Sequence, residues 1–352
     1  MLNASLPIVE ARSIAPAPAV RGYVPGLDGL RAIAVLLVIL YHSDPDGPFG
    51  GGFIGVDLFF VLSAFLITSI LVDQKEKTGS IRLGQFYWRR ALRLTPALLF
   101  FLATYVVVAP MIWPGYPHLR DALIAGFYVS NFAYVAEQIP VYIVHTWSLA
   151  AEEQFYLLWP VMLLLLLRWK RPALLLGVIW TGLTAFRFTT DDWFAYYYDL
   201  ARHGTGLVLG AILFFLLREG KLALSPIHAI FAAAIVAILS VNAQLGASAM
   251  AITVAEFASA IVIGTVITNP ASLRLLTARP LVGIGKLSYG LYLWNYPISR
   301  ALGEHVCRQH GRHWLIRFAE PIWTGAGSIL MTAFDPCGHW RELRVPSTGA
   351  NM

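Results

Sequence analysis

The sequence predicts an all-α fold: a polytopic transmembrane helical bundle of about ten membrane segments, one of them re-entrant. Of its residues, 57% are hydrophobic and only 13% are charged, and the mean hydropathy is +0.64. A soluble chain would normally carry about 25% charged residues. Several runs approach the ~20 apolar residues that cross a bilayer and recur along the chain, which favours helices over a barrel.

Apolar runs define the membrane segments in chain order. The clear runs cover residues 30–43, 54–72, 94–112, 149–167, 173–189, 204–217, 223–241, 250–268 and 286–301. The stretch 122–144 is less apolar. We expect it to enter and leave the membrane on one face or to stop at half depth, because the later basic connections otherwise do not share the cytoplasmic side. Irregular backbone at that depth must be covered by protein or line a cavity.

Basic residues set the orientation. They crowd the second connection, as Lys75, Lys77, Arg82, Arg89, Arg90 and Arg93. The positive-inside rule places this connection in the cytoplasm, so the N-terminus is cytoplasmic and the loop 44–52 faces outward. Because the net charge of +6 is explained by topology, no nucleic-acid partner is predicted.

The two ends differ from the membrane domain, which is expected to cover residues 22–300. Residues 1–21 lack the apolar run of a signal peptide and are expected to form a flexible cytoplasmic tail. Residues 301–352 form an atypical tail, which we interpret as not native-like. It holds both cysteines and four of the nine histidines, without the tight spacing of a metal site, so no metal is predicted.

Arg31 and His42 are the most informative pair of residues. They lie eleven positions apart, so a helix places them within about 20° of one face, roughly 16 Å apart along its axis. Ionisable groups on one stripe of a membrane helix face protein or a water-filled cavity. The alternative is that Arg31 reaches the interface from a helix end and His42 lies at the opposite interface.

Two further polar positions lie in the run from Gly51 to Thr68. Asp57 lies near the outer start of this segment and Ser63 lies within it. An intramembrane aspartate is costly and usually paired, so an arginine or histidine partner is expected for Asp57. The glycines of the same run are equally explained by close helix packing.

Two charged groups flank the next apolar runs. Arg90 and Arg93 are three positions apart and so are neighbours on one helix face. Such a pair binds phosphate well, but it is equally explained by topology and lipid headgroups. Glu152 and Glu153 follow at the lip of an apolar helix. Helix capping explains only one of them, so we expect the other to turn into the bundle.

Together these residues suggest an acyl transfer across the membrane. A neutral imidazole can remove a proton from a hydroxyl as it attacks a carbonyl, and a cytoplasmic arginine pair can hold a phosphate. The offset of ~16 Å between Arg31 and His42 is similar to the reach of a phosphopantetheine arm. The alternatives are a transporter or flippase of a glycolipid or acyl donor, in which the same charges line a pathway, and a structural partner of a polysaccharide synthase.

Five motifs in one order resemble the acyltransferase 3 family of multi-pass membrane O-acyltransferases, of the O-antigen and exopolysaccharide acetylase type. They are GLDGLRAIAVLLVILYH, GVDLFFVLSAFLIT, FYWRRALRLTP, HTWSLAAEEQFYLLWP and KLSYGLYLWNYP. The resemblance covers about residues 22–300. It implies a bacterial inner-membrane protein that uses acyl-CoA, usually acetyl-CoA, as donor substrate and a cell-envelope or extracellular saccharide as acceptor, with no bound cofactor.

The resemblance also implies roles for individual residues. The catalytic positions are His42, Arg31, Glu153 and Asp57, the donor-binding positions are Arg90 and Arg93, and the substrate-binding positions are Ser63 and Tyr289. Two positions depart from the family pattern. Ala64 replaces a usual glycine and Asn295 replaces a frequent histidine, so neither is assigned a catalytic role.

Overall fold

The computed structural model describes residues 22–242, 247–271 and 273–310, which form helices and connections without a β-strand. Two 3-10 turns, η1 (Gly52–Ile54) and η2 (Arg274–Thr277), join the longer elements. The expected tail 1–21 and residues 311–352 of the expected atypical tail lie outside the described residues. The α-helices are α1 (Pro25–Ser43), α2 (Gly55–Thr78), α3 (Leu83–Ile112), α4 (His118–Gly126), α5 (Ser130–Glu137), α6 (Thr146–Leu166), α7 (Pro172–Arg187), α8 (Trp193–Tyr197), α9 (Leu200–His203), α10 (Thr205–Arg218), α11 (Pro226–Ser240), α13 (Ala249–Thr268) and α14 (Arg279–His310).

Within these residues, six helical stretches are long and apolar enough to cross a membrane. Two further apolar helices, α7 and α11, are shorter. Large apolar side chains such as Phe100, Val107 and Met111 on α3 are exposed, as a lipid-facing surface requires. The chain is therefore a multi-pass membrane protein. The six stretches are Pro25–Ser43, Gly52–Thr78, Leu83–Ile112, Thr146–Leu166, Leu200–Arg218 and Ala249–Thr268.

Each of the nine clear apolar runs falls on a helix. The expected count of about ten membrane segments is not confirmed, because six helical stretches of the described residues are long enough to span. The less apolar stretch 122–144 forms the end of α4, the short helix α5 and an irregular connection. Its expected re-entrant path stays a prediction. Helix α3 begins at Leu83, earlier than the apolar run from residue 94. Arg90 and Arg93 therefore lie inside the helix, about one turn apart.

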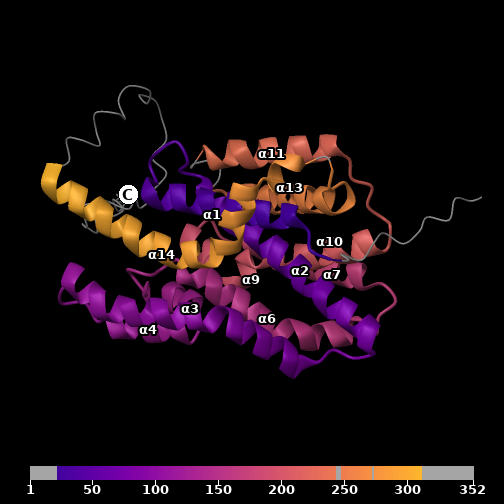
Figure 1. Ribbon diagram of the computed structural model, residues 1–352, viewed down its shortest axis with the longest axis horizontal. Helices are drawn as coiled ribbons and strands as arrows, with labels where there is room; N and C mark the ends of the chain where they lie inside the picture. Colours follow the sequence, from indigo (N-terminus) through magenta and orange to yellow (C-terminus); the bar gives the residue numbers. More distant parts are fainter. Residues whose placement is uncertain (1–21, 243–246, 272, 311–352) are drawn as a thin grey trace, which may run out of the picture.

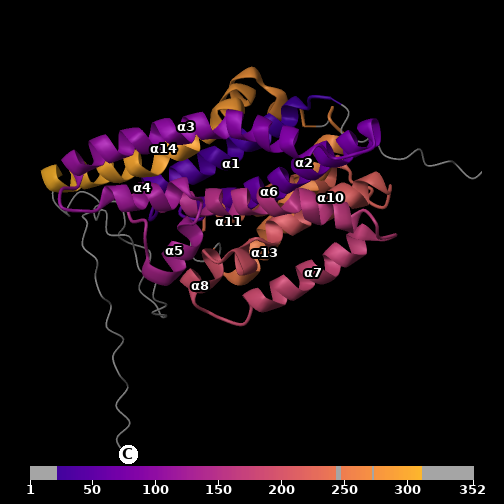
Figure 2. The same ribbon diagram turned by 90° about the horizontal axis from the view of Figure 1, so that it is seen from below.

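The long helices α1, α2 and α14 run through the middle of the bundle (Figure 1). In that view α3, α4 and α6 lie on one side of them, and α11 and α13 lie on the other. The view from below separates α7 and α8 from α1 and α3 (Figure 2). Helix α1 packs against both α2 and α14, and α6 packs against α2. Side chains on α1 can therefore meet residues from α6 and α14.

Helix α14 approaches α1 closely because of one glycine. A Cβ atom on Gly285 would lie 1.8 Å from the backbone oxygen of Asp28, which no packed structure tolerates. The absence of a side chain lets the two backbones touch and fixes how α14 faces α1. This contact determines which residues of α14 meet His42.

Candidate active site

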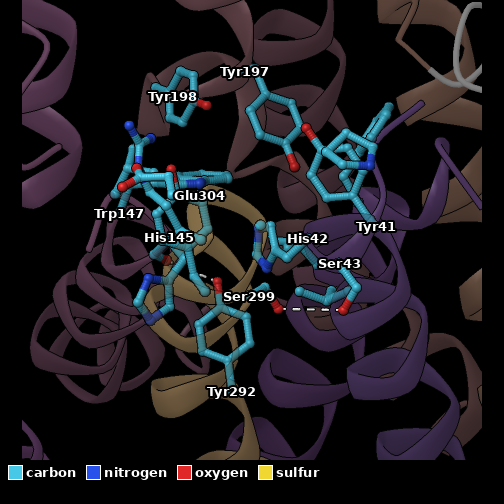
Figure 3. A pocket seen from close by; sticks show the side chains of 18 residues that line it. Tyr41, His42, Ser43, His145, Trp147, Tyr197, Tyr198, Tyr292, Ser299 and Glu304 are labelled. Atoms are coloured by element: carbon cyan, nitrogen blue, oxygen red, sulfur yellow. Dashed lines mark hydrogen bonds and ion pairs between the residues drawn. The ribbon is translucent and has the colours of Figure 1, made fainter. Parts of the chain in front are cut away.

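A pocket opens at the C-terminal end of α1, and His42 forms part of its wall. It encloses a cavity of about 110 Å³, which is room for several water molecules or a small acyl group. Figure 3 shows His42 and His145 among tyrosines that come from different segments of the bundle. Tyr197 and Tyr198 close one side, and Tyr292 and Ser299 of α14 lie on the opposite side (Figure 3).

His42 is held by Asn295 of α14. The His42 Nδ1 atom and the Asn295 side-chain oxygen form a short hydrogen bond. The Asn295 side-chain nitrogen donates to the backbone oxygen of Tyr292 at 2.5 Å. Ser43 directly follows His42 on α1, and its hydroxyl lies 3.3 Å from that of Ser299, about one turn beyond Asn295 on α14. Helices α1 and α14 are thus joined by two neighbouring polar contacts, one of which is made by the imidazole.

A second imidazole, that of His145, lines the same pocket. The two ring centroids lie 6.3 Å apart, and His145 is almost completely buried. Its Nε2 atom donates to the backbone oxygen of Leu293 at 3.0 Å, and its Nδ1 atom is buried without a hydrogen-bond partner. Burial, followed by the neighbouring His42, lowers the pKa of His145 to about 3. This imidazole is therefore neutral near pH 7 and offers a lone pair.

The tyrosines of the pocket are hydrogen-bond donors. Burial raises the pKa values of Tyr197 and Tyr198 well above the usual range, so both phenols stay protonated. At the rim, Arg300 pairs with Glu304 at 3.0 Å. The pocket thus combines aromatic walls, phenol donors, two imidazoles and one ion pair. This composition suits an uncharged, hydroxyl-rich molecule better than an ion.

A second polar group lies near the N-terminal half of α1. Arg90 on α3 binds Glu153 on α6 through three hydrogen bonds between 2.5 and 3.2 Å. The Arg90 guanidinium also lies 3.3 Å from the centroid of the Tyr156 ring. Both charged side chains are mostly buried. Glu153 is therefore fully engaged by Arg90.

The neighbouring carboxylate of Glu152 is less satisfied. One of its oxygens is buried without a hydrogen-bond partner. The carboxylate interacts with the Ser63 hydroxyl and with the charges of Arg90 and Arg31. Both adjacent glutamates therefore turn into the bundle. Only Glu152 has a carboxylate oxygen without a hydrogen-bond partner.

Six of the predicted site residues meet around this group. Arg93 lies within electrostatic range of Arg31 and Arg90, and Arg31 also pairs with Asp28 at 2.8 Å. Tyr289 donates to the backbone oxygen of Leu94 at 3.3 Å, beside the glutamates. We call this set the arginine cluster. Its predicted members are Arg31, Ser63, Arg90, Arg93, Glu153 and Tyr289.

Arg31 and His42 do face the same side of α1, as their spacing predicts. Arg31 faces Glu152, and His42 faces His145. Glu152 and His145 are seven positions apart, which is close to two helical turns, so they share one face at the start of α6. The surroundings of Arg31 and of His42 on α1 are nevertheless separate sites, because Arg31 does not line the pocket that contains His42.

Asp57 lies neither in the lining of the His42 pocket nor in the arginine cluster. Its Oδ1 atom pairs with His203 Nε2 at 2.8 Å, and both side chains are completely buried, so the expected histidine partner is confirmed. A buried ion pair of Arg187 and Glu256, 2.7 Å apart, lies nearby. The His203 ring packs on Trp147 and Tyr197, which line the pocket. These contacts place Asp57 behind the pocket wall, and its catalytic role stays a prediction.

The motifs alone did not single out the residues that surround His42. His145 begins one of the quoted motifs, and the polar spacing of His145, Ser148, Glu152 and Tyr156 follows one helix face. That periodicity could have identified His145 and favoured Glu152. Asn295 offered no such signal, because its partner is 253 positions away in the sequence.

Known proteins match most of this chain. A family described as an acyltransferase domain matches residues 24–334. Peptidoglycan O-acetyltransferase OatA of Listeria monocytogenes is 38% identical over 312 residues, which cover 79% of this chain and 50% of that protein. O-acetyltransferase OatA of Staphylococcus aureus is 35% identical over 354 residues, which cover 92% of this chain and 57% of that protein.

This chain spans about half the length of the curated relatives it matches. No solved structure matches it. The family match covers most of the chain, including α1, α14 and every segment that contributes to the pocket and the arginine cluster. The chain therefore belongs to the acyltransferase 3 family, as a multi-pass membrane member.

Proposed function

We propose that this chain is an O-acetyltransferase of the bacterial inner membrane, which moves an acetyl group from acetyl-CoA to a hydroxyl of a cell-wall saccharide. The observation that carries the proposal is the pocket in which His42 and His145 face each other, with a lone pair of His145 unpartnered. The relative from Listeria monocytogenes, which is named a peptidoglycan O-acetyltransferase, supports the acceptor class.

The composition of the pocket supports a sugar as acceptor. The C–H face of a sugar ring packs on aromatic side chains, which Tyr41, Trp147 and Tyr197 supply. The remaining hydroxyls of a sugar can bond to phenols and to the rim residues Ser43 and Arg300. A sugar that enters between the two imidazoles can place one hydroxyl against His42 as the base and a neighbouring hydroxyl against the lone pair of His145.

In the proposed reaction, His42 takes the proton of the acceptor hydroxyl as its oxygen attacks the thioester carbonyl. The new C–O bond forms, the C–S bond breaks, and the proton passes from the imidazolium to the leaving thiolate. His145 remains neutral and orients a neighbouring hydroxyl of the sugar, which donates to its lone pair. No covalent enzyme intermediate is required.

The arginine cluster is the proposed binding site for the phosphates of the donor. Glu153 engages Arg90 through three hydrogen bonds, whereas Asp28 engages Arg31 through one nitrogen. Arg93 and the remaining nitrogens of Arg31 are therefore the groups that would contact phosphate. Arg93 is exposed, and the positive charges of Arg31 and Arg90 repel it. A bound phosphate would relieve that repulsion. The placement thus favours donor binding for Arg31 over direct orientation of His42.

The axial separation between the two sites fits a donor that reaches from one to the other. Arg31 and His42 are about 16 Å apart along α1, similar to the length of a phosphopantetheine arm. The proposed donor therefore binds by its phosphates at the cytoplasmic end and presents its thioester to the pocket at the outer end.

A transfer assay in detergent separates this proposal from a transporter, because detergent removes the two compartments. Purified protein receives acetyl-CoA labelled in the acetyl group and a soluble cell-wall glycan. We expect label in base-labile esters of the glycan. Absence of ester, together with accumulation of labelled substrate in vesicles that contain the protein, would favour a transporter instead. His228→Gln, an exposed position at the start of α11, is the control variant and should transfer label normally.

A further inference from the structure

The side chain of Asn295 has a fixed orientation. Its amide nitrogen lies 2.5 Å from the backbone oxygen of Tyr292. A carbonyl oxygen only accepts hydrogen bonds, so the group beside it must be the NH2 end of the amide. The oxygen end of Asn295 therefore faces His42 Nδ1. The orientation follows from the backbone of α14 and not from the imidazole.

This orientation determines the protonation of the His42 ring. An amide oxygen cannot donate, so His42 Nδ1 must carry the hydrogen of their bond. In the neutral imidazole the lone pair is then on Nε2. Asn295 thus selects one of the two neutral tautomers of His42. Nε2 is left as the ring nitrogen that can take a proton from a molecule in the pocket.

The support for Asn295 is rigid. The residue is buried and lies on α14 between the close contact at Gly285 and the Ser43–Ser299 contact. Tyr292, whose backbone oxygen accepts from the amide nitrogen, is itself held by its hydroxyl, which donates to the His145 backbone oxygen at 2.9 Å and lies 2.5 Å from the Ser148 hydroxyl. These contacts restrain both the amide and the ring it touches.

We propose that Asn295 is a positioning residue that holds His42 in the Nδ1-protonated tautomer, so that Nε2 is the atom that accepts the proton of the acceptor hydroxyl. This inference rests on the proposed function, in which His42 is the base. An amide fixes the tautomer without adding a charge. A carboxylate at the same place would instead stabilise the imidazolium and make its proton harder to release.

The other ionisable groups around His42 come from four segments. Tyr41 is on α1, His145 precedes α6, and Tyr197 and Tyr198 lie at the end of α8. Helix α14 contributes Tyr292, Tyr296 and the pair Arg300–Glu304. All of them remain in place when only Asn295 is replaced. A difference in pH dependence between the wild type and an Asn295 variant therefore reports on the Asn295–His42 contact.

The test compares Asn295→Leu and Asn295→Asp with wild type in the detergent assay, over a range of pH. Asn295→Leu removes the acceptor and frees the tautomer, so we expect kcat to fall about 10- to 100-fold, with KM for both substrates within about twofold. Asn295→Asp restores an acceptor at Nδ1. We expect it to recover part of kcat and to move the acidic limb of the pH profile upward by roughly one unit.

Controls keep the outcomes distinct. Leu302→Ala, on an exposed position of α14, should leave kcat and the pH profile unchanged. If Asn295→Leu fails to fold, the pH profile of the near-isosteric Asp variant decides the question. A wild-type kcat in the Leu variant, or an unmoved acidic limb in the Asp variant, would overturn the positioning role. If His42→Ala is as active as wild type, the base role in the proposed function is wrong instead.

Discussion

The imidazoles of His42 and His145 face each other across one pocket, with ring centroids 6.3 Å apart and ring planes inclined at 75°. They come from the end of α1 and the start of α6, and each is oriented by α14. Asn295 bonds to His42, and the backbone of Leu293 bonds to His145. One helix thus fixes both nitrogen lone pairs relative to each other.

Replacement of His145 should impair turnover more than donor binding. His145→Phe keeps a buried aromatic ring and removes the lone pair, so we expect kcat to fall by about tenfold or more while KM for acetyl-CoA is unchanged. Steady-state kinetics with varied donor and fixed glycan measure this. If kcat is unchanged, the lone pair of His145 has no part in the reaction.

The two adjacent glutamates should differ in their effect on stability. Glu153→Gln leaves Arg90 mostly buried without its counter-charge, so we expect a loss of about 2 kcal/mol in the free energy of unfolding. Glu152→Gln replaces a carboxylate that has an unpartnered oxygen, and we expect no loss. Thermal unfolding of both variants in the same detergent checks this. Equal melting temperatures would show that the Arg90–Glu153 pair contributes nothing to stability.

Arg93 should affect the donor and not the acceptor. Arg93→Ala removes an exposed cation of the arginine cluster, so we expect KM for acetyl-CoA to rise by about tenfold, as for one lost charge-assisted hydrogen bond. KM for the glycan should stay the same. Arg120→Ala, which removes an exposed cation paired with Glu137, is the matched control. If KM for acetyl-CoA rises equally in both variants, the effect comes from general surface charge and not from a donor site at Arg93.

Asp57 should be needed for folding more than for chemistry. Its contact with His203 is completely buried, and removal of one member of a buried pair costs roughly 3–5 kcal/mol. We therefore expect Asp57→Leu to lower the melting temperature strongly, while the folded fraction keeps kcat within about threefold. Activity normalised to protein that elutes as a folded species measures this. A stable but inactive variant would instead support the catalytic role that the family resemblance implies.

The fold was largely predictable because membrane helices are defined by local composition. Each clear apolar run became a helix, and the eleven-residue spacing of Arg31 and His42 placed both on one side of α1. These features depend only on residues within one helix. The helical period is enough to predict them.

The contacts of the site were less predictable because they join distant parts of the sequence. The motif resemblance selected Glu153 as the catalytic carboxylate. In the structure Glu153 is paired with Arg90, which lies 63 positions away in the sequence. The carboxylate with an unpartnered oxygen is that of Glu152, which the resemblance did not select. Asn295 was left without a role because it differs from the family pattern. Its contact with His42 depends on the approach of α14 to α1 at Gly285, which no local pattern reveals.

The base role of His42 is tested most directly by a single-turnover experiment with purified protein, labelled acetyl-CoA and a soluble cell-wall glycan, read by mass spectrometry of the glycan. We expect wild-type protein to form the acetylated glycan and His42→Asn to form it at least about 100-fold more slowly, with the same folded fraction. Equal rates for the two proteins would contradict the central claim that His42 is the base.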